Sequence, residues 1–308
     1  MASPPPHGSM RKLLLQLDSS PHPSVFDRIV AFDGGADEVM SYGGVTEDAV
    51  RDLVHGAIFT RGPKDLRNTA IFIGGTDMTV GERILAAVRK AFFGPMRVSV
   101  MLDPNGSNTT AVAAVAKLLQ AAGPGSTGGP GGNLQGGRAV VTAGTGPVGV
   151  RAAGLLAKAG ADVVLTSRRP EQNTKVIEGL QQRFGDSVRA VKMADSSQAA
   201  AVIEGAQMVL NAGGAGVCLV PRYAWAGRAG LRAVADLNAV PPLGVEGIEV
   251  NDDGVEREGV TAFGALGVGK LKMKIHKACI ARLFEHNDLV LDAETIAEVA
   301  RDFVPPRA

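Results

Sequence analysis

The residues with the clearest chemical potential form a glycine-rich turn, Gly-Thr-Gly-Pro-Val-Gly at 144–149. A stretch that favours a strand, 138–142, precedes the turn, and a helical pattern with Leu155 and Leu156 on one side follows it. Glycines at such a junction let the backbone approach a pyrophosphate, which then binds at the helix N-terminus. A second predicted strand at 162–166 completes a β-α-β unit, so the pattern indicates dinucleotide binding rather than an ordinary glycine turn. The candidate cofactor contacts here are Gly144, Thr145, Gly146, Pro147, Val148 and Gly149.

The end of the second predicted strand indicates which dinucleotide is bound. Sites for NAD place an acidic residue about 20 residues beyond the glycines, where it holds the ribose hydroxyls. This chain has Ser167-Arg168-Arg169 there, and its next acidic residue is Glu171. A hydroxyl and two guanidinium groups suit a 2′-phosphate, because arginine meets phosphate oxygens through a planar fork of donors. The segment therefore favours NADP, the alternative being a basic turn that only faces solvent.

Small residues recur at the ends of the later predicted strands, near positions 211, 236 and 263. They allow a flat nicotinamide and its ribose to lie against the backbone, although turn chemistry alone would also favour such residues. The candidate cofactor contacts among them are Ala212, Gly213, Asn238, Gly264 and Ala265.

A polar segment in the first part of the chain is a second candidate site. Residues 103–110 follow the predicted strand 97–102 and precede a predicted helix at 111–122. Open α/β sheets bind ligands at the carboxyl ends of their strands, so this segment is placed where a substrate would bind. Ser107 and Asn108 would also serve as helix N-caps, but capping needs one such side chain rather than several.

Strands and helices alternate along the chain, which predicts an α/β fold with parallel sheets and right-handed crossovers. The first part holds predicted strands at 12–17, 70–74 and 97–102, with helices beginning at Pro23, Thr46 and Val80. Four segments are predicted: a disordered tail at 1–10, a small α/β substrate-binding domain at 11–122, a glycine-rich linker at 123–137, and a Rossmann NADP-binding domain at 138–270. We expect the C-terminal helices of 271–308 to return to the first domain and complete it.

Composition excludes several classes of protein. The formal net charge of the 308 residues is +1, and one Trp and two Tyr are present, which argues against a nucleic-acid or membrane partner. No apolar run approaches the roughly 20 residues that a membrane helix needs. Cys218 and Cys279 lie far apart without metal-ligand spacing, so neither a disulfide framework nor a metal site is predicted. We expect a cytoplasmic protein.

Several motifs together resemble one family, the NADP-dependent methylene-tetrahydromethanopterin dehydrogenases of methylotrophic bacteria, which are relatives of the bifunctional methylene-tetrahydrofolate dehydrogenases. The resemblance extends over about 11–304, and the Pro-rich start and the long glycine linker depart from it. The segments that carry it most strongly are Phe93-Gly-Pro95, Asn105-Gly-Ser-Asn-Thr-Thr110, Ala143-Gly-Thr-Gly-Pro-Val-Gly149, Pro241-Pro-Leu-Gly244 and Phe263-Gly-Ala-Leu-Gly267.

The resemblance implies a reaction in which a methylene bridge between two pterin nitrogens is oxidised to a methenyl bridge and hydride passes to NADP. It also implies a substrate cleft between the domains and a homo-oligomer, with a trimer as one form. Lys272 matches the cleft lysine of the family, and Asp18 or Asp103 would favour the developing cation; these three are the catalytic candidates. The candidate substrate-binding residues are Thr60, Arg61, Asp77, Ser107, Asn108 and Thr110.

Other functions stay open at this stage. The substrate could be methylene-tetrahydrofolate, or the chain could be a shikimate-type NADP dehydrogenase, which shares the two-domain layout. A protein that only senses NADP without catalysis is a further alternative, although the polar segment 103–110 argues against it. The four lysines at 270, 272, 274 and 277 would mostly face solvent, and Lys272 could be one of those.

Overall fold

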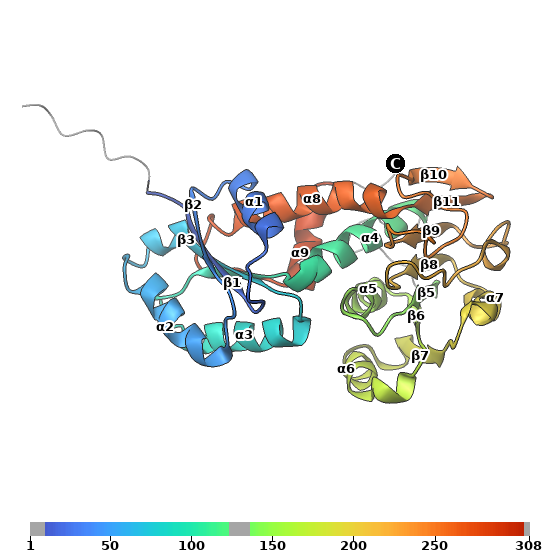
Figure 1. The fold of residues 1–308 in the computed structure, drawn as a ribbon, viewed down its shortest axis with the longest axis horizontal. Helices are drawn as coiled ribbons and strands as arrows, with labels where there is room; N and C mark the ends of the chain where they lie inside the picture. The colour runs from blue at the N-terminus through green and yellow to red at the C-terminus, as the bar shows by residue number, and fades with distance from the viewer. Residues whose placement is uncertain (1–9, 123–135, 305–308) are drawn as a thin grey trace, which may run out of the picture. The chain divides into compact units, whose positions relative to one another are not determined.

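The computed structural model describes residues 10–122 and 136–304, and their contacts divide the chain into two compact units (Figure 1). The first unit comprises Met1–Gly106 and His276–Asp292, and the second comprises Ser107–Ile275 and Ala293–Ala308. Most of the predicted tail and linker, residues 1–9 and 123–135, lies outside the described residues. Within the described part of the chain, no helix is both long and apolar enough to cross a bilayer.

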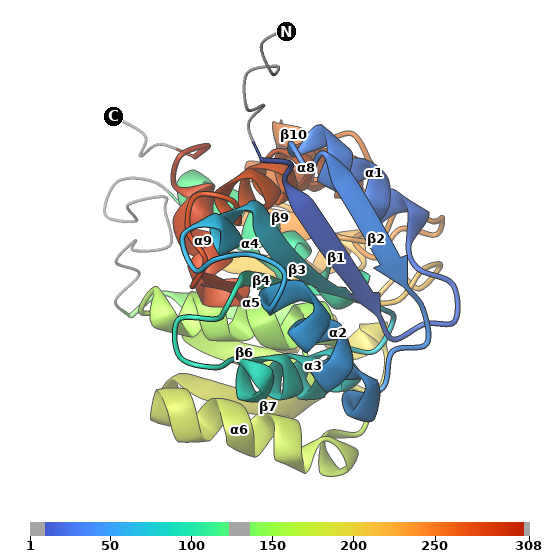
Figure 2. The same cartoon turned by 90° about the vertical axis from the view of Figure 1, so that its left-hand side faces the viewer.

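The first unit contains a five-stranded parallel sheet in the order β12-β4-β3-β1-β2 (Figure 2). Its strands are β1 (Leu13–Asp18), β2 (Glu38–Tyr42), β3 (Thr69–Gly74), β4 (Ser99–Leu102) and β12 (Val290–Leu291). β3 and β4 are buried along their whole length, as is typical of parallel strands covered on both faces. The chain order reverses between β1 and β3, so the carboxyl ends of these strands form the switch point of this sheet.

Helices cover both faces of this sheet, because alternate strand residues point to opposite sides. On one face Leu15 and Leu17 share a core with α2 (Glu47–Ile58) and α3 (Met78–Ala91). On the other face the Gln16 amide donates to the carbonyl of Ser24, the N-cap of α1 (Val25–Asp33).

The second unit contains a seven-stranded sheet in the order β10-β11-β9-β8-β5-β6-β7. All neighbours are parallel except the pair β10 and β11. The strands are β5 (Arg138–Thr142), β6 (Asp162–Ser167), β7 (Val188–Lys192), β8 (Met208–Asn211), β9 (Ala233–Asp236), β10 (Asp253–Arg257) and β11 (Val260–Phe263). The order reverses between β5 and β8, which makes their carboxyl ends the switch point where such sheets bind ligands.

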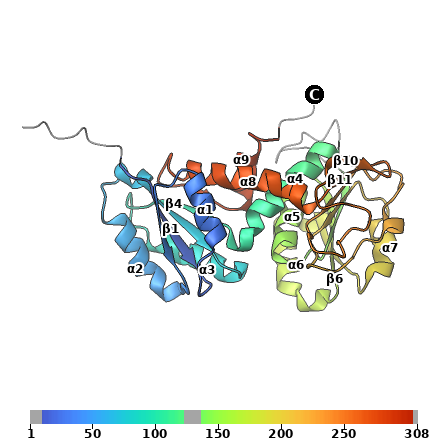
Figure 3. The ribbon, with the colours of Figure 1, turned by 45° about the horizontal axis from the view of Figure 1, so that its top comes forward.

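Helices flank this second sheet as the sequence predicts. Figures 1 and 3 show α5 (Pro147–Lys158) and α6 (Thr174–Phe184) on one side of the sheet and α7 (Ala199–Ile203) on the other. The buried Trp225 belongs to the core on the α7 side. The α/β fold with two parallel-type sheets, one of them Rossmann-like, is therefore confirmed.

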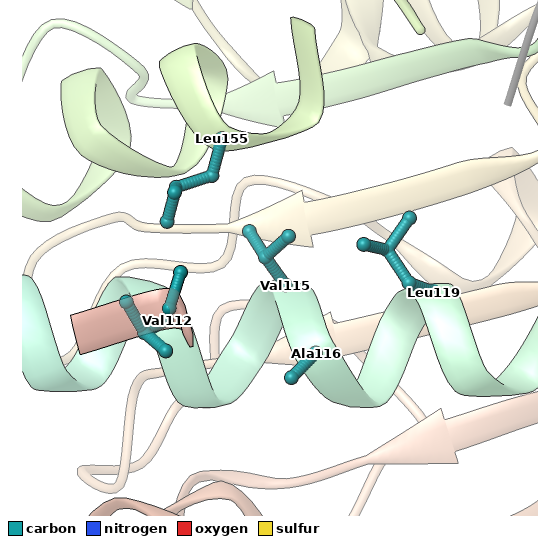
Figure 4. Close-up of a pocket in the computed structure, with 6 residues that line it drawn as sticks. Val112, Val115, Ala116, Leu119 and Leu155 are labelled. Carbon is teal, nitrogen blue, oxygen red and sulfur yellow. The ribbon is translucent and has the colours of Figure 1, made fainter. Parts of the chain in front are cut away.

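Helix α4 (Ser107–Ala121) is buried on nearly all sides and packs against α5 and α9 (Ala293–Ala300). Figure 4 shows its side chains meeting that of Leu155 on α5. They leave a small cavity of about 10 Å³, about the volume of a single water-sized probe. The cavity is lined by Val112, Val115, Ala116, Leu119, Leu155 and Ala297.

The division into units differs from the predicted domains at α4 and α9. Both helices belong to the second unit by their contacts, whereas the sequence predicts them in the first domain. An all-round apolar helix such as α4 gives no pattern that shows which unit it will pack against. The last part of α8 (Ala265–Arg282), from His276, and β12 belong to the first unit by their contacts.

We predict that Glu294 makes the stability of the protein depend on pH. Lys158 of α5 donates to this carboxylate at 2.5 Å, and Arg183 of α6 also pairs with it. The hydrogen bond from Lys158, supported by Arg183, lowers the pKa of Glu294 below its usual 4.5. A lowered folded-state pKa stabilises the protein at pH values above about 4.5, and this contribution is lost as the pH falls through the folded pKa.

The variant Glu294→Gln should therefore lower Tm at pH 7 and narrow the Tm difference between pH 7 and pH 3, measured by calorimetry. Glu298→Gln on the same helix, an exposed residue, is the matched control. Equal Tm changes for both variants at both pH values would contradict this role of Glu294.

Candidate dinucleotide site

The glycine turn joins β5 to α5 at the switch point of the second sheet. Gly146 is the N-cap of α5 and Pro147 its first residue, where proline is favoured because its missing N–H has no partner in the helix. The turn is fixed from β6: the Ala143 N–H donates to the Thr166 hydroxyl at 3.1 Å, and the Gly144 N–H donates to the Thr166 carbonyl at 2.9 Å. Thr166 is thus a site residue that the sequence analysis did not select.

The glycines of the turn have different physical reasons for lacking a side chain. A Cβ at Gly144 would lie 2.5 Å from the Leu165 Cβ, and one at Gly149 would lie 2.6 Å from the Gly144 Cα. These two glycines let α5 pack closely on the sheet. A Cβ at Gly146 would meet only the Ala143 carbonyl, at 3.6 Å, so its open side leaves room for a ligand to approach the backbone.

A pocket of about 580 Å³ opens beside this turn. It extends from the turn past the end of β6 to the segment after β8, and none of its lining residues is acidic. Six of the predicted cofactor contacts line it: Thr145, Gly146, Ser167, Arg168, Arg169 and Ala212. The other lining residues, which are not among the predicted cofactor contacts, are Ala143, Thr166, Gln172, Asn173, Met193, Gly214, Val217 and Leu219.

The basic turn after β6 is ordered around the Ser167 hydroxyl. That oxygen accepts the Arg169 N–H at 3.2 Å and the Asn173 amide at 3.4 Å, and Asn173 also donates to the Arg169 carbonyl at 3.0 Å. The side chains of Arg168 and Arg169 are exposed. The arrangement offers an anion two guanidinium groups on a backbone that is held in place beforehand.

The other predicted cofactor contacts do not line the pocket. Gly264 packs against backbone, since a Cβ there would lie 2.0 Å from the Glu249 carbonyl. Asn238 uses its side chain within its own loop, accepting the Val240 N–H and donating to the Pro242 carbonyl. Gly213, Ala265, Gly144, Gly149, Pro147 and Val148 are likewise not among the lining residues.

At the first unit's switch point, three predicted aspartates follow β1, β3 and β4, and each is already engaged. The buried Asp18 accepts the Ser20 N–H at 2.8 Å and the Ser24 N–H at 3.0 Å, so it holds the loop before α1. Asp77 is exposed and caps α3. Asp103 is fully buried. Burial raises the pKa of the Cys279 thiol, and the Asp103 carboxylate raises it further, which keeps this thiol protonated.

Thr60 and Arg61 are not brought together with these aspartates. The Arg61 guanidinium donates to the Asn68 carbonyl, the Thr69 hydroxyl and the Arg11 carbonyl. Thr69 is the first residue of β3, so Arg61 lies at the amino edge of the sheet, opposite the edge formed by Asp18. Arg61 thus joins chain segments at that edge, and the Thr60 hydroxyl donates to the Ala57 carbonyl.

The segment after β4 contains a backbone feature that sequence patterns do not reveal. Asn105 has φ 53° and is exposed, and Gly106 follows with φ 61°. A left-handed conformation at a residue other than glycine costs energy and often marks a functional site. Asn105 is not among the predicted site residues, although it begins one of the motifs that carry the family resemblance.

Three predicted residues begin α4, and two of them are inaccessible. Ser107 and Asn108 are buried, while Thr110 is half-buried. The Arg151 guanidinium of α5 donates to the Asn108 amide oxygen at 2.9 Å. Asn108 therefore joins the first turns of α4 and α5.

Lys272 lies on the part of α8 that belongs to the second unit. It is half-buried, whereas Lys270 and Lys274 on the same helix are exposed, and Lys277 pairs with Asp33 at 2.7 Å. Partial burial distinguishes Lys272 from the lysines that only face solvent.

The fold and the pocket define a two-unit α/β protein whose second unit has a Rossmann-type sheet with a pocket at its switch point. Comparisons with known proteins identify the family. The first unit matches the family model described as methylene-tetrahydromethanopterin dehydrogenase, N-terminal, over residues 25–105.

Two curated relatives come from Methylorubrum extorquens. The chain is 50% identical over 292 residues to the bifunctional protein MdtA, covering 95% of this chain and 99% of the relative. It is 34% identical over 288 residues to an NAD(P)-dependent methylenetetrahydromethanopterin dehydrogenase, covering 92% and 95%. The chain belongs to the methylene-tetrahydromethanopterin dehydrogenase family, as its motifs predict, and is an oxidoreductase.

A solved structure supports the fold independently. Shikimate 5-dehydrogenase from Listeria monocytogenes aligns with a TM-score of 0.54 at 14% identity, over 94% of this chain and 96% of that one. At this identity the likeness concerns the fold alone.

We predict that Gly146 and Gly149 respond differently to the same substitution. Gly146→Ala should raise the Kd for NADP at least about tenfold, because the added methyl enters the open side of the turn, while Tm of the free protein changes little. Gly149→Ala is the matched control and should lower Tm markedly, because its methyl meets the Gly144 backbone. The measurements are calorimetric unfolding and titration with NADP. A large Tm loss for Gly146→Ala, or an unchanged Kd, would contradict the assignment.

Proposed function

We infer that this chain oxidises methylene-tetrahydromethanopterin to methenyl-tetrahydromethanopterin with NADP, by direct hydride transfer in one-carbon metabolism. The observation that carries this inference is the 50% identity to a family member over nearly the full length of both chains. The pocket at the switch point supports it, since its glycine turn and basic turn together suit a phosphorylated dinucleotide.

NADP fits the residues that are present. The open side of Gly146 lets a pyrophosphate approach the N-terminus of α5. Arg168 and Arg169, on a turn ordered by Ser167 and Asn173, would hold the 2′-phosphate. An acidic residue, which would favour the free ribose hydroxyls of NAD, is absent from the lining. When bound, NADP supplies the nicotinamide that accepts the hydride.

The reaction needs little acid or base catalysis from the protein. The methylene C–H bond breaks, its electron pair leaves as hydride, and the positive charge that remains is shared by the two pterin nitrogens. No proton has to move in this step. The chain therefore contributes by holding the reacting carbon at a near-attack distance and by keeping water from the cationic product.

For the pterin we propose Asn105, in the segment after β4, as a substrate contact of the first unit. Lys272 of the second unit is proposed separately, because its partial burial distinguishes it from the exposed lysines of α8. Asn105 is the exposed polar side chain of this segment, and its left-handed backbone is the supporting observation. Thr110, which is half-buried, is a further candidate contact. Asp103, Ser107 and Asn108 are buried within the segment and would shape it from beneath, whereas Asp18 holds the loop before α1. The proposed site is built without Thr60 and Arg61, which lie at the other edge of the sheet.

We also propose a homo-oligomer, with a trimer as the expected form, in the cytoplasm. An apolar surface supports assembly, because Val25, Phe26, Ile29 and Phe32 of α1 are exposed, and contiguous surfaces of this kind are typical of interfaces. The cytoplasm is the compartment in which free cysteines such as Cys218 and Cys279 stay reduced.

The test is steady-state oxidation of methylene-tetrahydromethanopterin and methylene-tetrahydrofolate, each with NADP and with NAD, followed through reduced nicotinamide. We expect turnover of the methanopterin substrate with NADP, and the folate rate measures the second candidate function. No turnover of either pterin by a protein that binds NADP would contradict the proposed function.

We predict that Lys272→Met lowers kcat/KM at least about tenfold, because a positioning contact to the substrate is lost. Lys274→Met on the same helix is the control and should stay within about twofold, since that lysine is exposed. Equal rates for the two variants would remove Lys272 from the site.

We predict that the double variant Arg168→Ala/Arg169→Ala raises the Kd for NADP by about 10- to 100-fold and leaves the Kd for NAD nearly unchanged. The loss reflects charged hydrogen bonds of about 1.5–3 kcal/mol each, reduced by solvent screening at this exposed turn. Arg189→Ala, at an exposed position of β7, is the control. A parallel loss of NADP and NAD binding would show that the arginines do not read the 2′-phosphate.

A further inference from the structure

A row of polar side chains crosses the centre of the second sheet at its carboxyl edge. Thr142, Asn211 and Asp236 end the adjacent strands β5, β8 and β9, and they are partners in register. The Thr142 hydroxyl donates to the Asn211 amide oxygen at 2.7 Å, and the Asn211 amide nitrogen donates to Asp236 Oδ1 at 2.8 Å. All three are at most 1% exposed. A buried carboxylate is costly unless hydrogen bonds satisfy it.

Hydrogen bonds from the loop that follows β9 offset the cost of burying the Asp236 carboxylate. Oδ1 accepts the Asn238 N–H and Oδ2 accepts the Val245 N–H, both at 3.0 Å. The Asn238 side chain adds two hydrogen bonds within the loop, because it accepts the Val240 N–H and donates to the Pro242 carbonyl. Both ends of the loop 238–245 are thus attached to one carboxylate.

This loop in turn holds the segment that forms a wall of the dinucleotide pocket. The Gly216 N–H donates to the Val240 carbonyl at 3.2 Å, and the Leu219 N–H donates to the Gly244 carbonyl at 2.9 Å. At the other end of the segment, the Gly213 N–H donates to the Asn211 amide oxygen at 3.2 Å. The residues of this segment that line the pocket are Ala212, Gly214, Val217 and Leu219.

The packing leaves no room for the loop to move closer. A Cβ at Gly244 would lie 1.8 Å from the Asn211 amide nitrogen and 2.7 Å from Asp236 Oδ1. The backbone of the loop therefore rests directly on the polar row, and a change in that row transfers to the wall 212–219. None of Thr142, Asn211 or Asp236 lines the pocket itself.

We propose that Asp236 is a positioning residue for the bound dinucleotide. Through Asn211 and the loop 238–245 it fixes the wall 212–219, and with it the place where NADP is held for hydride transfer. This inference rests on the proposed function only in taking NADP as the ligand. Asp236 itself makes no contact with the ligand and takes no part in proton transfer.

The experiment compares Asp236→Asn and Thr142→Val with the parent protein. The measurements are Tm, a titration that gives the Kd and the emission spectrum of bound NADPH, and the single-turnover rate at saturating NADP. Thr142→Val is included because it removes one hydrogen bond without a charge and is the milder change for folding. We expect both variants to shift the emission of bound NADPH and to slow hydride transfer at least about tenfold, because small misplacements of the reacting groups are costly. Thr142→Ser should restore both readouts.

Ser99→Ala is the matched control, since the Ser99 hydroxyl is buried in β4 and bonds to His286 and Leu289 of the first unit. It should lower Tm without shifting the emission or slowing the transfer beyond about twofold. Variants of Thr142 and Asp236 that lose Tm as Ser99→Ala does, with emission and rate unchanged, would overturn the proposal. A parent protein that turns over neither pterin, with the emission still shifted in both variants, would instead refute the proposed function and leave the positioning role intact.

Discussion

The close approach of α5 to the second sheet is the constraint on which the site depends. Two positions without side chains, Gly144 and Gly149, allow the helix to begin directly against the turn. A side chain at Gly144 would collide with Leu165 of β6 and displace the turn from the sheet, and one at Gly149 would push α5 away from the turn. The N-terminus of α5, where the helix dipole favours an anion, therefore lies at the pocket that Gly146 lines. The open side of Gly146 completes this arrangement, because it leaves the approach itself unobstructed.

Each sheet has a buried aspartate at its carboxyl edge that holds a loop in place. Asp18 ends β1 and accepts two backbone N–H groups of the loop before α1. Asp236 ends β9 and accepts two backbone N–H groups of the loop after it. In each case a buried carboxylate orders an irregular segment. The charged side chains at these positions therefore hold loops in place. A charged residue can thus lie near a site without contacting the ligand.

The sequence patterns predicted the elements well where periodicity and glycine spacing were strong, as in the β5–α5–β6 unit. They predicted contacts less well. Asp18 and Asn238 have the residue types of ligand contacts. Their polar side-chain atoms instead accept hydrogen bonds from backbone N–H groups of loops, and no sequence pattern predicts these bonds. The Arg61 side chain forms its hydrogen bonds at the amino edge of the sheet. This position becomes clear only from the register of β1 and β3. Thr166 and Asn173 act through the backbone geometry of two turns, and residue type alone does not encode that geometry.

The two units are interleaved along the chain. The first unit needs β12 from 290–291 to complete its sheet, and the second needs α9 from 293–300 to cover α4. During synthesis from the N-terminus, the first unit therefore lacks a strand until residue 291 has been made, and the second unit lacks a helix until residue 300 has been made. Cutting the gene between the two sheets would thus yield two incomplete pieces. Circular permutation would not remove this interleaving, because it keeps the alternating order of the four segments; each unit could be produced separately only if its two segments were fused directly to each other.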